Sequence, residues 1–273
     1  IIGHVEKGTV LNCHVAGKVA ISGADAGGVA GYVYECTITN CSATGSVTAY
    51  DSQHIADKTS FHADCSATGS VTAYNSQSDL GGLVGAVYNS TVTGCFATGV
   101  VTTNVKPASA GGLAGYVSGG SISNCYATAS VTGSSGGYTG GLVGRIEKTH
   151  WFPEEVRLAN CYSTGVVKGD ICTGGLVGLS DSDSVSMCFW DVETSGQTVS
   201  DGGRGLASEQ MKHISLYQHA GWPGSIWVMQ EGEYPRLAWE QTGSEPIPEA
   251  GLLPLPGQGT ASEPYQVSTG EQF

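Results

Sequence analysis

The stretch GGLVGAVYNSTVTGCFATGVVT at residues 81–102 returns 30 residues later as GGLAGYVSGGSISNCYATASVT at residues 111–132. Each copy opens with a glycine box, GGLVG or GGLAG, and continues into a block that contains one cysteine. Glycine boxes recur at residues 27–31, 81–85, 111–115, 140–144 and 174–178. The cysteine recurs 24 to 36 residues apart, as Cys13, Cys41, Cys65, Cys95, Cys125, Cys161 and Cys188. A repeat of this length indicates a solenoid, because one turn cannot bury its inner face without the next.

The residues around each cysteine predict short strands joined by a tight bend. We count positions from the cysteine. Residues at +2, +4 and +6 lie on the same face of a strand as the cysteine (the same parity) and are mostly small or apolar, so they should face inward with it. Position -3 has the opposite parity but is aliphatic in six of the seven copies, which requires a bend between the two. The residue directly before the cysteine is Asn, Asp or Gly in six copies and Met187 in the seventh. Asn, Asp and Gly tolerate the left-handed backbone conformation that such a bend needs.

Composition supports the same fold class. The chain has 42 glycines among 273 residues and only 13% charged residues, and its apolar residues are largely small or β-branched. Glycine disfavours helices, whereas Val, Ile and Thr favour strands. We therefore expect an all-β protein, a parallel β-helix (β-solenoid) of about seven rungs with a small C-terminal cap. The glycine boxes are expected where backbones approach too closely for side chains.

Four segments are predicted. Residues 1–188 form the solenoid, and residues 189–240, richer in Trp and charge, form a cap over its open strand edges. Residues 241–258 are a Pro/Gly-rich linker. Residues 259–273 are expected to begin a further repeat block and to be disordered in isolation. The chain begins within a repeat, so we expect it to be part of a longer protein with any export signal upstream.

Net charge and hydropathy exclude two classes of partner. The formal net charge of -13 repels phosphate backbones, so nucleic acid is not an expected partner. No apolar stretch approaches the roughly 20 residues that a membrane-spanning helix needs.

No catalytic, metal-binding or cofactor-binding residue is expected. The seven cysteines occupy one inward position and are predicted to be reduced and buried as small hydrophobic residues. Disulfides between rungs stay an alternative, because strands about 4.8 Å apart permit the Cα spacing but seldom the side-chain geometry. No CxxC pair is present, which argues against zinc. A carbohydrate-active enzyme would need clustered carboxylates, yet residues 81–144 contain no acidic residue.

One outward face is a candidate contact surface. Threonine stands three positions after the cysteine in five copies, and in three of these five an aromatic residue stands one position after it. The face comprises Thr44, Thr68, Thr98, Thr128 and Thr164 with Phe96, Tyr126 and Tyr162. A threonine ladder could order water, as an ice-binding face does, and an aromatic row could stack on sugars. The simpler interpretation is that β-branched threonine favours exposed strand positions.

The five boxes and seven cysteine blocks resemble the GLUG-motif repeat family over roughly residues 3–240. The segment CFWDVETSGQTVSDGGRGLASEQMK at residues 188–212 also resembles the way such arrays end, and residues 259–273 resemble the way they begin. The resemblance implies a bacterial secreted or cell-surface protein, often adhesin-like. Its partners would be host or surface proteins, glycans, and neighbouring repeat blocks of the same chain.

The leading hypothesis is therefore a non-catalytic structural or adhesive region at the cell surface or outside the cell. One alternative is an accessory binding region of a larger secreted enzyme, a peptidase or a carbohydrate-active enzyme. Similar repeats flank the catalytic region of some immunoglobulin A-cleaving metallopeptidases, but their HExxH motif is absent here. A carbohydrate-active β-helix enzyme is the remaining alternative.

Overall fold

The computed structural model describes residues 79–103, 108–150, 156–181, 185–240 and 243–248 in full. Between residues 2 and 73 it describes the backbone of eight strands. These are β1 (Ile2–Glu6), β2 (Thr9–Leu11), β3 (His14–Ala16), β4 (Val19–Ile21), β5 (Ala30–Tyr34), β6 (Thr37–Thr39), β7 (Cys41–Ala49) and β8 (Cys65–Ala73). The chain divides into two compact units, residues 1–211 and residues 212–273.

The rest of the first unit is built from short strands. They are β9 (Asp79–Gly81), β10 (Val84–Thr93), β11 (Cys95–Thr103), β12 (Ser109–Gly111), β13 (Ala114–Ser123), β14 (Tyr126–Ala127), β15 (Ser130–Thr132), β16 (Tyr138–Gly140), β17 (Val143–Ile146), β18 (Arg157–Ala159), β19 (Tyr162–Ser163), β20 (Val167–Lys168), β21 (Cys172–Gly174), β22 (Val177–Ser180), β23 (Val185–Ser186), β24 (Phe189–Asp191) and β25 (Arg204–Leu206). Helix α1 (Val192–Ser195) lies between β24 and β25, and the 3-10 turn η1 (Gln210–Lys212, which runs into the second unit) follows β25.

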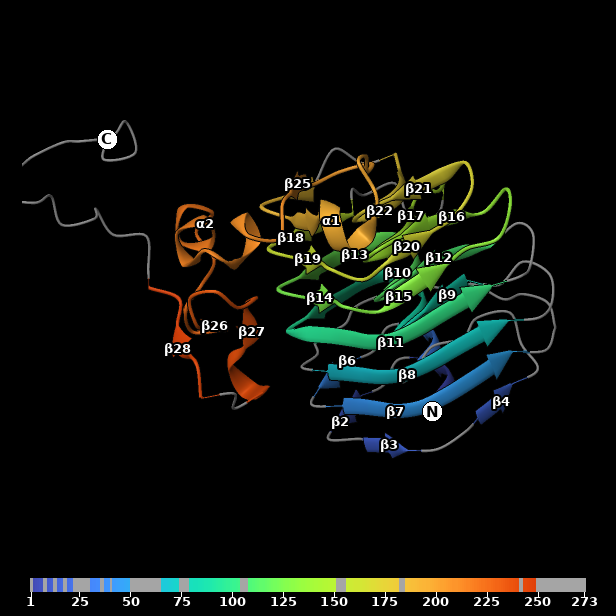
Figure 1. The fold of residues 1–273 in the computed structure, drawn as a ribbon. Coiled ribbons are helices and arrows are strands. Elements are labelled where there is room, and N and C mark those ends of the chain that lie inside the picture. The colour runs from blue at the N-terminus through green and yellow to red at the C-terminus, as the bar shows by residue number, and fades with distance from the viewer. Residues whose placement is uncertain are drawn as a thin grey trace, which may run out of the picture. The chain divides into compact units, whose positions relative to one another are not determined.

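Every strand pair that the structure describes up to Leu206 is parallel, and, apart from β5 with β10, the paired strands come from successive turns. One sheet follows the order β1-β5-β10-β13-β17-β22, and a second follows β25-β24-β19-β14-β11-β8-β7-β3. A third follows β21-β16-β12-β9. Figure 1 shows β7, β8 and β11 side by side as three arrows that point the same way. This is the predicted β-solenoid.

The number of rungs is not confirmed. Seven strands of the described chain pass through the cysteine blocks before β25, but only six follow the path through the glycine boxes. The difference arises at β5, which pairs directly with β10 and places Ala30 opposite Val84. In the other sheet the strand β8 lies between β7 and β11, so that sheet has one strand more at this point.

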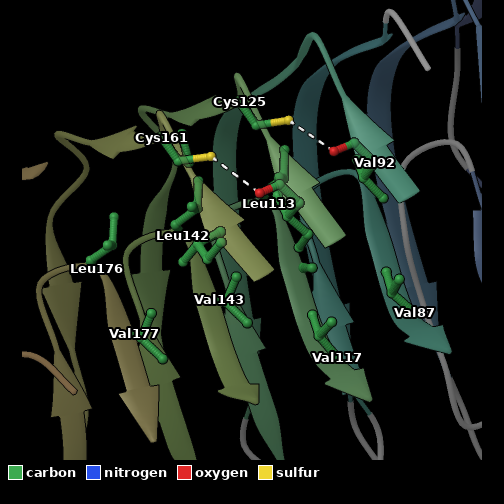
Figure 2. Close-up of a cluster of buried hydrophobic side chains, with 14 of the residues drawn as sticks. Val87, Val92, Leu113, Val117, Cys125, Leu142, Val143, Cys161, Leu176 and Val177 are labelled. Atoms are coloured by element: carbon green, nitrogen blue, oxygen red, sulfur yellow. Dashed lines mark hydrogen bonds between the residues drawn. The ribbon is translucent and has the colours of Figure 1, made fainter. Parts of the chain in front are cut away.

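The register agrees with the alignment on cysteine. Cys41 pairs with Cys65 and Cys65 with Cys95, while further along the stack Tyr126 pairs with Tyr162. The inward positions stack into an interior ladder, made up of Cys95, Cys125, Cys161 and Cys188, Ala97 and Ala127, and Val101, Val131 and Val167. All of these side chains are buried, as are the rows of leucine and valine labelled in Figure 2. The interior ladder confirms the inward parity for the described turns.

The predicted bend before the cysteine is present in each turn whose side chains are described. Gly94, Asn124, Asn160 and Met187 all have positive φ, between 50° and 65°. Glycine and asparagine adopt this conformation readily, but methionine does so at a cost. Met187 is therefore held there by the repeat rather than by its own preference.

The glycine boxes lie where backbones are in contact. A Cβ at Gly112 would overlap the carbonyl oxygen of Gly141 in the next turn, and one at Gly115 would overlap the amide of Leu80. The second glycine of each box between residues 81 and 178 also faces the residue two after the cysteine. A Cβ at Gly112 would lie 2.8 Å from Cβ of Ala127, and one at Gly175 would overlap the ring of Trp190. The last turn thus replaces alanine with a tryptophan, which packs where glycine leaves room.

The second unit has a different architecture. It contains helix α2 (Ile214–His219), strands β26 (Trp227–Met229), β27 (Arg236–Leu237) and β28 (Glu245–Pro246), and the 3-10 turn η2 (Ala238–Glu240). Strand β26 pairs antiparallel with both β27 and β28. Three buried rings form its core, with centroids of Tyr217 and Trp222 4.7 Å apart and those of Trp222 and Trp227 4.5 Å apart.

The predicted segment boundaries differ from the division into two units at residues 211 and 212. Strand β24 still pairs in parallel with β19, so the turn at residues 189–191 continues the stack, and the predicted cap at residues 189–240 falls in both units. Part of the predicted linker at residues 241–258 forms β28, because Ile247 is buried and its amide donates to Trp227 O. The predicted repeat start at residues 259–273 lies outside the described residues. No helix in the described part of the chain is long and apolar enough to cross a membrane.

Candidate functional site

The cysteine column is part of the core. Cys95, Cys125, Cys161 and Cys188 are buried free thiols, while Cys13 and the side chains of Cys41 and Cys65 lie outside what the structure describes. Each of the four donates to the backbone two residues earlier; Cys125 Sγ lies 3.1 Å from Ser123 O. Cys125 and Cys161 also reach the previous turn, at 3.8 and 3.9 Å from Val92 O and Ile122 O (Figure 2).

Burial and contacts within the column shift two of these thiols in opposite directions. Desolvation raises the pKa of the Cys161 thiol well above its usual value, which favours the unreactive protonated form. Desolvation also acts on the Cys125 thiol, but hydrogen bonds with Cys161 and Cys95 outweigh it and lower the pKa of that thiol. The column therefore has the environment of a packing element. Its redox state in solution stays a prediction.

The predicted contact face is only partly accessible. Thr98, Thr128 and Thr164 are half-buried, and Thr44 and Thr68 lie in register with Thr98 although their side chains are outside the description. The aromatic row stacks: the Phe96 and Tyr126 centroids are 4.9 Å apart and the Tyr126 and Tyr162 centroids 5.0 Å apart, with rings within 8° of parallel.

The expectation that these tyrosines are outward and available to a sugar needs correction. Tyr126 and Tyr162 are fully buried, and Phe96 is half-buried. Parallel stacking at this distance covers both faces of Tyr126, so a sugar ring cannot stack on it. The row stabilises the stack of turns.

A different group of polar and aromatic side chains gathers on the other two sheets. We call it the Arg145 cluster, and it comprises Asp79, Tyr88, Ser109, Tyr116, Tyr138, Arg145 and Glu147. Asp79 of β9, Ser109 of β12 and Tyr138 of β16 occupy one ladder position in successive turns. Tyr116 of β13 and Arg145 of β17 are paired in the neighbouring sheet. The glycine boxes hold these two sheets close enough for the side chains to meet.

Arg145 lies at the centre of the cluster. Its Nη2 donates to Glu147 Oε1 at 2.7 Å, and Tyr116 OH donates to Glu147 Oε2 at 3.0 Å. The guanidinium lies over the Tyr138 ring at 4.7 Å and over the Tyr116 ring at 5.9 Å, within the range of cation–π attraction. Tyr88 extends the row of rings, 5.4 Å from Tyr116 between centroids.

The electrostatics of Asp79 are unusual for a surface-strand carboxylate. Burial raises the pKa of Asp79 from 3.8 to about 6. Hydrogen bonds from Ser109 and the positive charge of Arg145 lower this pKa, and the negative charge of Glu147 raises it, but burial is the largest effect. Burial likewise raises the pKa of the Tyr116 hydroxyl, which stays protonated and donates to Glu147. A carboxylate whose pKa is shifted by desolvation together with a specific charged partner is a candidate functional group.

The repeat pattern did not predict this cluster. Asp79 and Glu147 lie just outside residues 81–144, the segment without acidic residues, one at either end. The available signal was a break in the repeat: the box is preceded by Asp79 in one turn and by Ser109 and Tyr138 at that position in the next two. In the described ranges no group of three or more His, Cys, Asp or Glu residues could hold a metal ion.

Comparison with known proteins identifies the repeat. The family model described as "The GLUG motif" matches residues 22–48, 76–102 and 107–132. A protein of Evansella cellulosilytica described as a putative Gly-rich membrane protein is 32% identical over 109 residues, which are 37% of this chain and 12% of that protein. The chain therefore spans about an eighth of the length of that relative.

A solved structure also resembles the chain. It is the crystal structure of a putative immunoglobulin A1 protease from Bacteroides ovatus, with a TM-score of 0.48 and 15% sequence identity. The match covers 74% of this chain and 78% of that one.

Proposed function

Because the chain carries three copies of the GLUG motif, we propose that it is a non-catalytic structural or adhesive region of a secreted or cell-surface protein, which presents its solenoid surface to proteins or glycans. In this proposal the array has about seven rungs. Neighbouring repeat blocks of the same protein extend it.

The observation that carries the proposal is the in-register stacking of equivalent residues. Nine consecutive positions of β8 pair with those of β11 without a break, and the same residue types recur in the interior ladder. A stack of this kind gives a rigid, extended surface, which is how repeat proteins make contacts over large areas. The membrane description of the Evansella relative is consistent with a location at the cell surface.

The location can be tested on intact cells. Antibodies raised against the full chain should stain unpermeabilised cells of the source organism or detect the protein in its culture medium. External protease should remove the cell-associated signal while a cytoplasmic marker survives. Staining only after permeabilisation, with no secreted protein, would contradict the proposal.

A further inference from the structure

Arg145 has hydrogen-bonding capacity that the described residues leave unused. Only Nη2 has a partner, Glu147, while Nε is buried and makes no hydrogen bond to any described residue. A buried unpaired donor carries a free-energy cost, so the hydrogen bonding of this guanidinium is incomplete in the structure; a ligand would meet its exposed part rather than the buried Nε. The side chain of Arg145 keeps 28% of its surface exposed and that of Glu147 keeps 32%, which leaves both within reach of a small molecule.

The charge balance of the cluster selects the class of ligand. Arg145 and Glu147 neutralise one another, and Asp79 adds a negative charge as it ionises. An anion would meet this added negative charge, and a metal cation would have to compete with the guanidinium for Glu147. An uncharged ligand with several hydroxyl groups meets neither obstacle, because it can accept from Arg145 and donate to the carboxylates at once.

The rings supply the apolar part of such a site. Tyr88 and Tyr138 are half-buried, whereas Tyr116 is buried and holds Glu147 in place through its hydroxyl. A few fixed polar groups beside aromatic surface are typical of small-molecule sites. Fixing Glu147 before a ligand arrives lowers the entropy lost on binding.

From this geometry we propose that the Arg145 cluster binds a neutral sugar residue, whose hydroxyls pair with Arg145, Glu147 and Asp79 and whose apolar face rests on Tyr138 and Tyr88. The site lies on the sheets of β9, β12 and β16 and of β10, β13 and β17, away from the threonine ladder. This inference rests on the proposed function in one respect, that the solenoid surface makes contacts, and it names what is bound.

The test is binding of the full chain to neutral saccharides. The probes are glucose, galactose, mannose, N-acetylglucosamine and their short oligomers, each measured by saturation-transfer NMR and titration calorimetry. At least one should bind, and Arg145→Ala and Tyr138→Ala should each weaken it by about tenfold or more, as expected for the loss of a charge-assisted hydrogen bond or a ring contact. Arg157→Ala, an exposed arginine on β18 of the same solenoid, is the matched control and should bind as the unchanged chain does.

Folding of each variant is checked by its circular dichroism spectrum and melting temperature. Arg145→Lys keeps the charge but loses the planar donor fork, so it should fold and still bind more weakly. No binding of any neutral probe at 10 mM, on the order of the weakest affinities usually measured, would overturn the proposal, as would equal binding by Arg145→Lys and the unchanged chain. Preference for uronic or sialic acids would also overturn it. Protease treatment of intact cells tests the proposed function separately, because it does not depend on any sugar.

Discussion

The interior ladder and the Arg145 cluster are built by the same parallel stacking but differ in what is stacked. The ladder repeats one residue type at each position, such as Val101, Val131 and Val167. The cluster changes type at every turn: Asp79, Ser109 and Tyr138 share one ladder position, and Tyr116 is followed by Arg145 at another. Where like stacks on like, the residues specify the fold. Where the repeat is broken, three turns contribute different side chains to one place, and these can form a binding site.

The largest effect is expected from a charge in the interior ladder. Val131→Asp places a carboxylate where Val131 is fully buried between Val101 and Val167. An unpaired buried charge should lower the free energy of unfolding by about 4 kcal/mol or more. Thr128→Ser, at a half-buried position on the opposite face of the same turn, should change it by less than about 1 kcal/mol. Urea denaturation of both variants measures the difference, and similar midpoints would mean that the inward parity is wrong.

A second effect concerns the backbone contact that brings the sheets together. Gly112→Ala adds a Cβ that overlaps Gly141 O and lies 2.8 Å from Cβ of Ala127, so the turns must separate. Overpacking of this kind should cost about 3 kcal/mol. Gly136→Ala is the control, because its added Cβ meets nothing within 4 Å and only the positive φ of 77° is unfavourable. This substitution should cost about 1 kcal/mol. If both variants lowered the melting temperature by the same amount, the crowding of backbones at Gly112 would not be the cause of its effect.

The cluster itself should show a pH dependence of stability. The pKa of Asp79 is raised to about 6 in the fold, so the folded state binds the proton more tightly than the unfolded chain does. This contribution is full below pH 3.8 and is lost as the pH rises to about 6. Asp79→Asn cannot ionise, so relative to the unchanged chain its stability should gain about 2 kcal/mol between pH 4 and pH 7. Unfolding curves of both proteins at the two pH values measure this gain. A difference in stability that is the same at both pH values would mean that the Asp79 carboxylate is solvated and not desolvated by the fold.

The smallest effect returns to the repeat. Met187 has a φ of 50° and is 53% exposed, at the position where earlier turns have Asn124 and Asn160. Met187→Asn should stabilise the chain by about 1 kcal/mol, because asparagine tolerates the left-handed conformation better. The exchange in the other direction, Asn160→Met, should destabilise it by a similar amount. Two shifts of the same sign in melting temperature would contradict this account of the bend.

The sequence by itself determined the solenoid fold, the register on cysteine, the inward parity and the left-handed bend. These features are local, since a period of two and a preference for Asn or Gly can be read without knowing which turns meet. GLUG-type glycine boxes likewise predicted close backbone contact, which the structure confirms at Gly112 and Gly115.

Only the tertiary structure decided which side chains from different turns lie together. It buried Tyr126 and Tyr162, which parity alone placed on the surface, because stacked rings cover one another. It continued the stack through β24 and added β28 to the second unit, where composition predicted a cap and a linker. It also brought Asp79 and Glu147, 68 residues apart in the chain, to one arginine. A short-range pattern carries no information on such contacts, because they depend on the packing of two sheets across the glycine boxes.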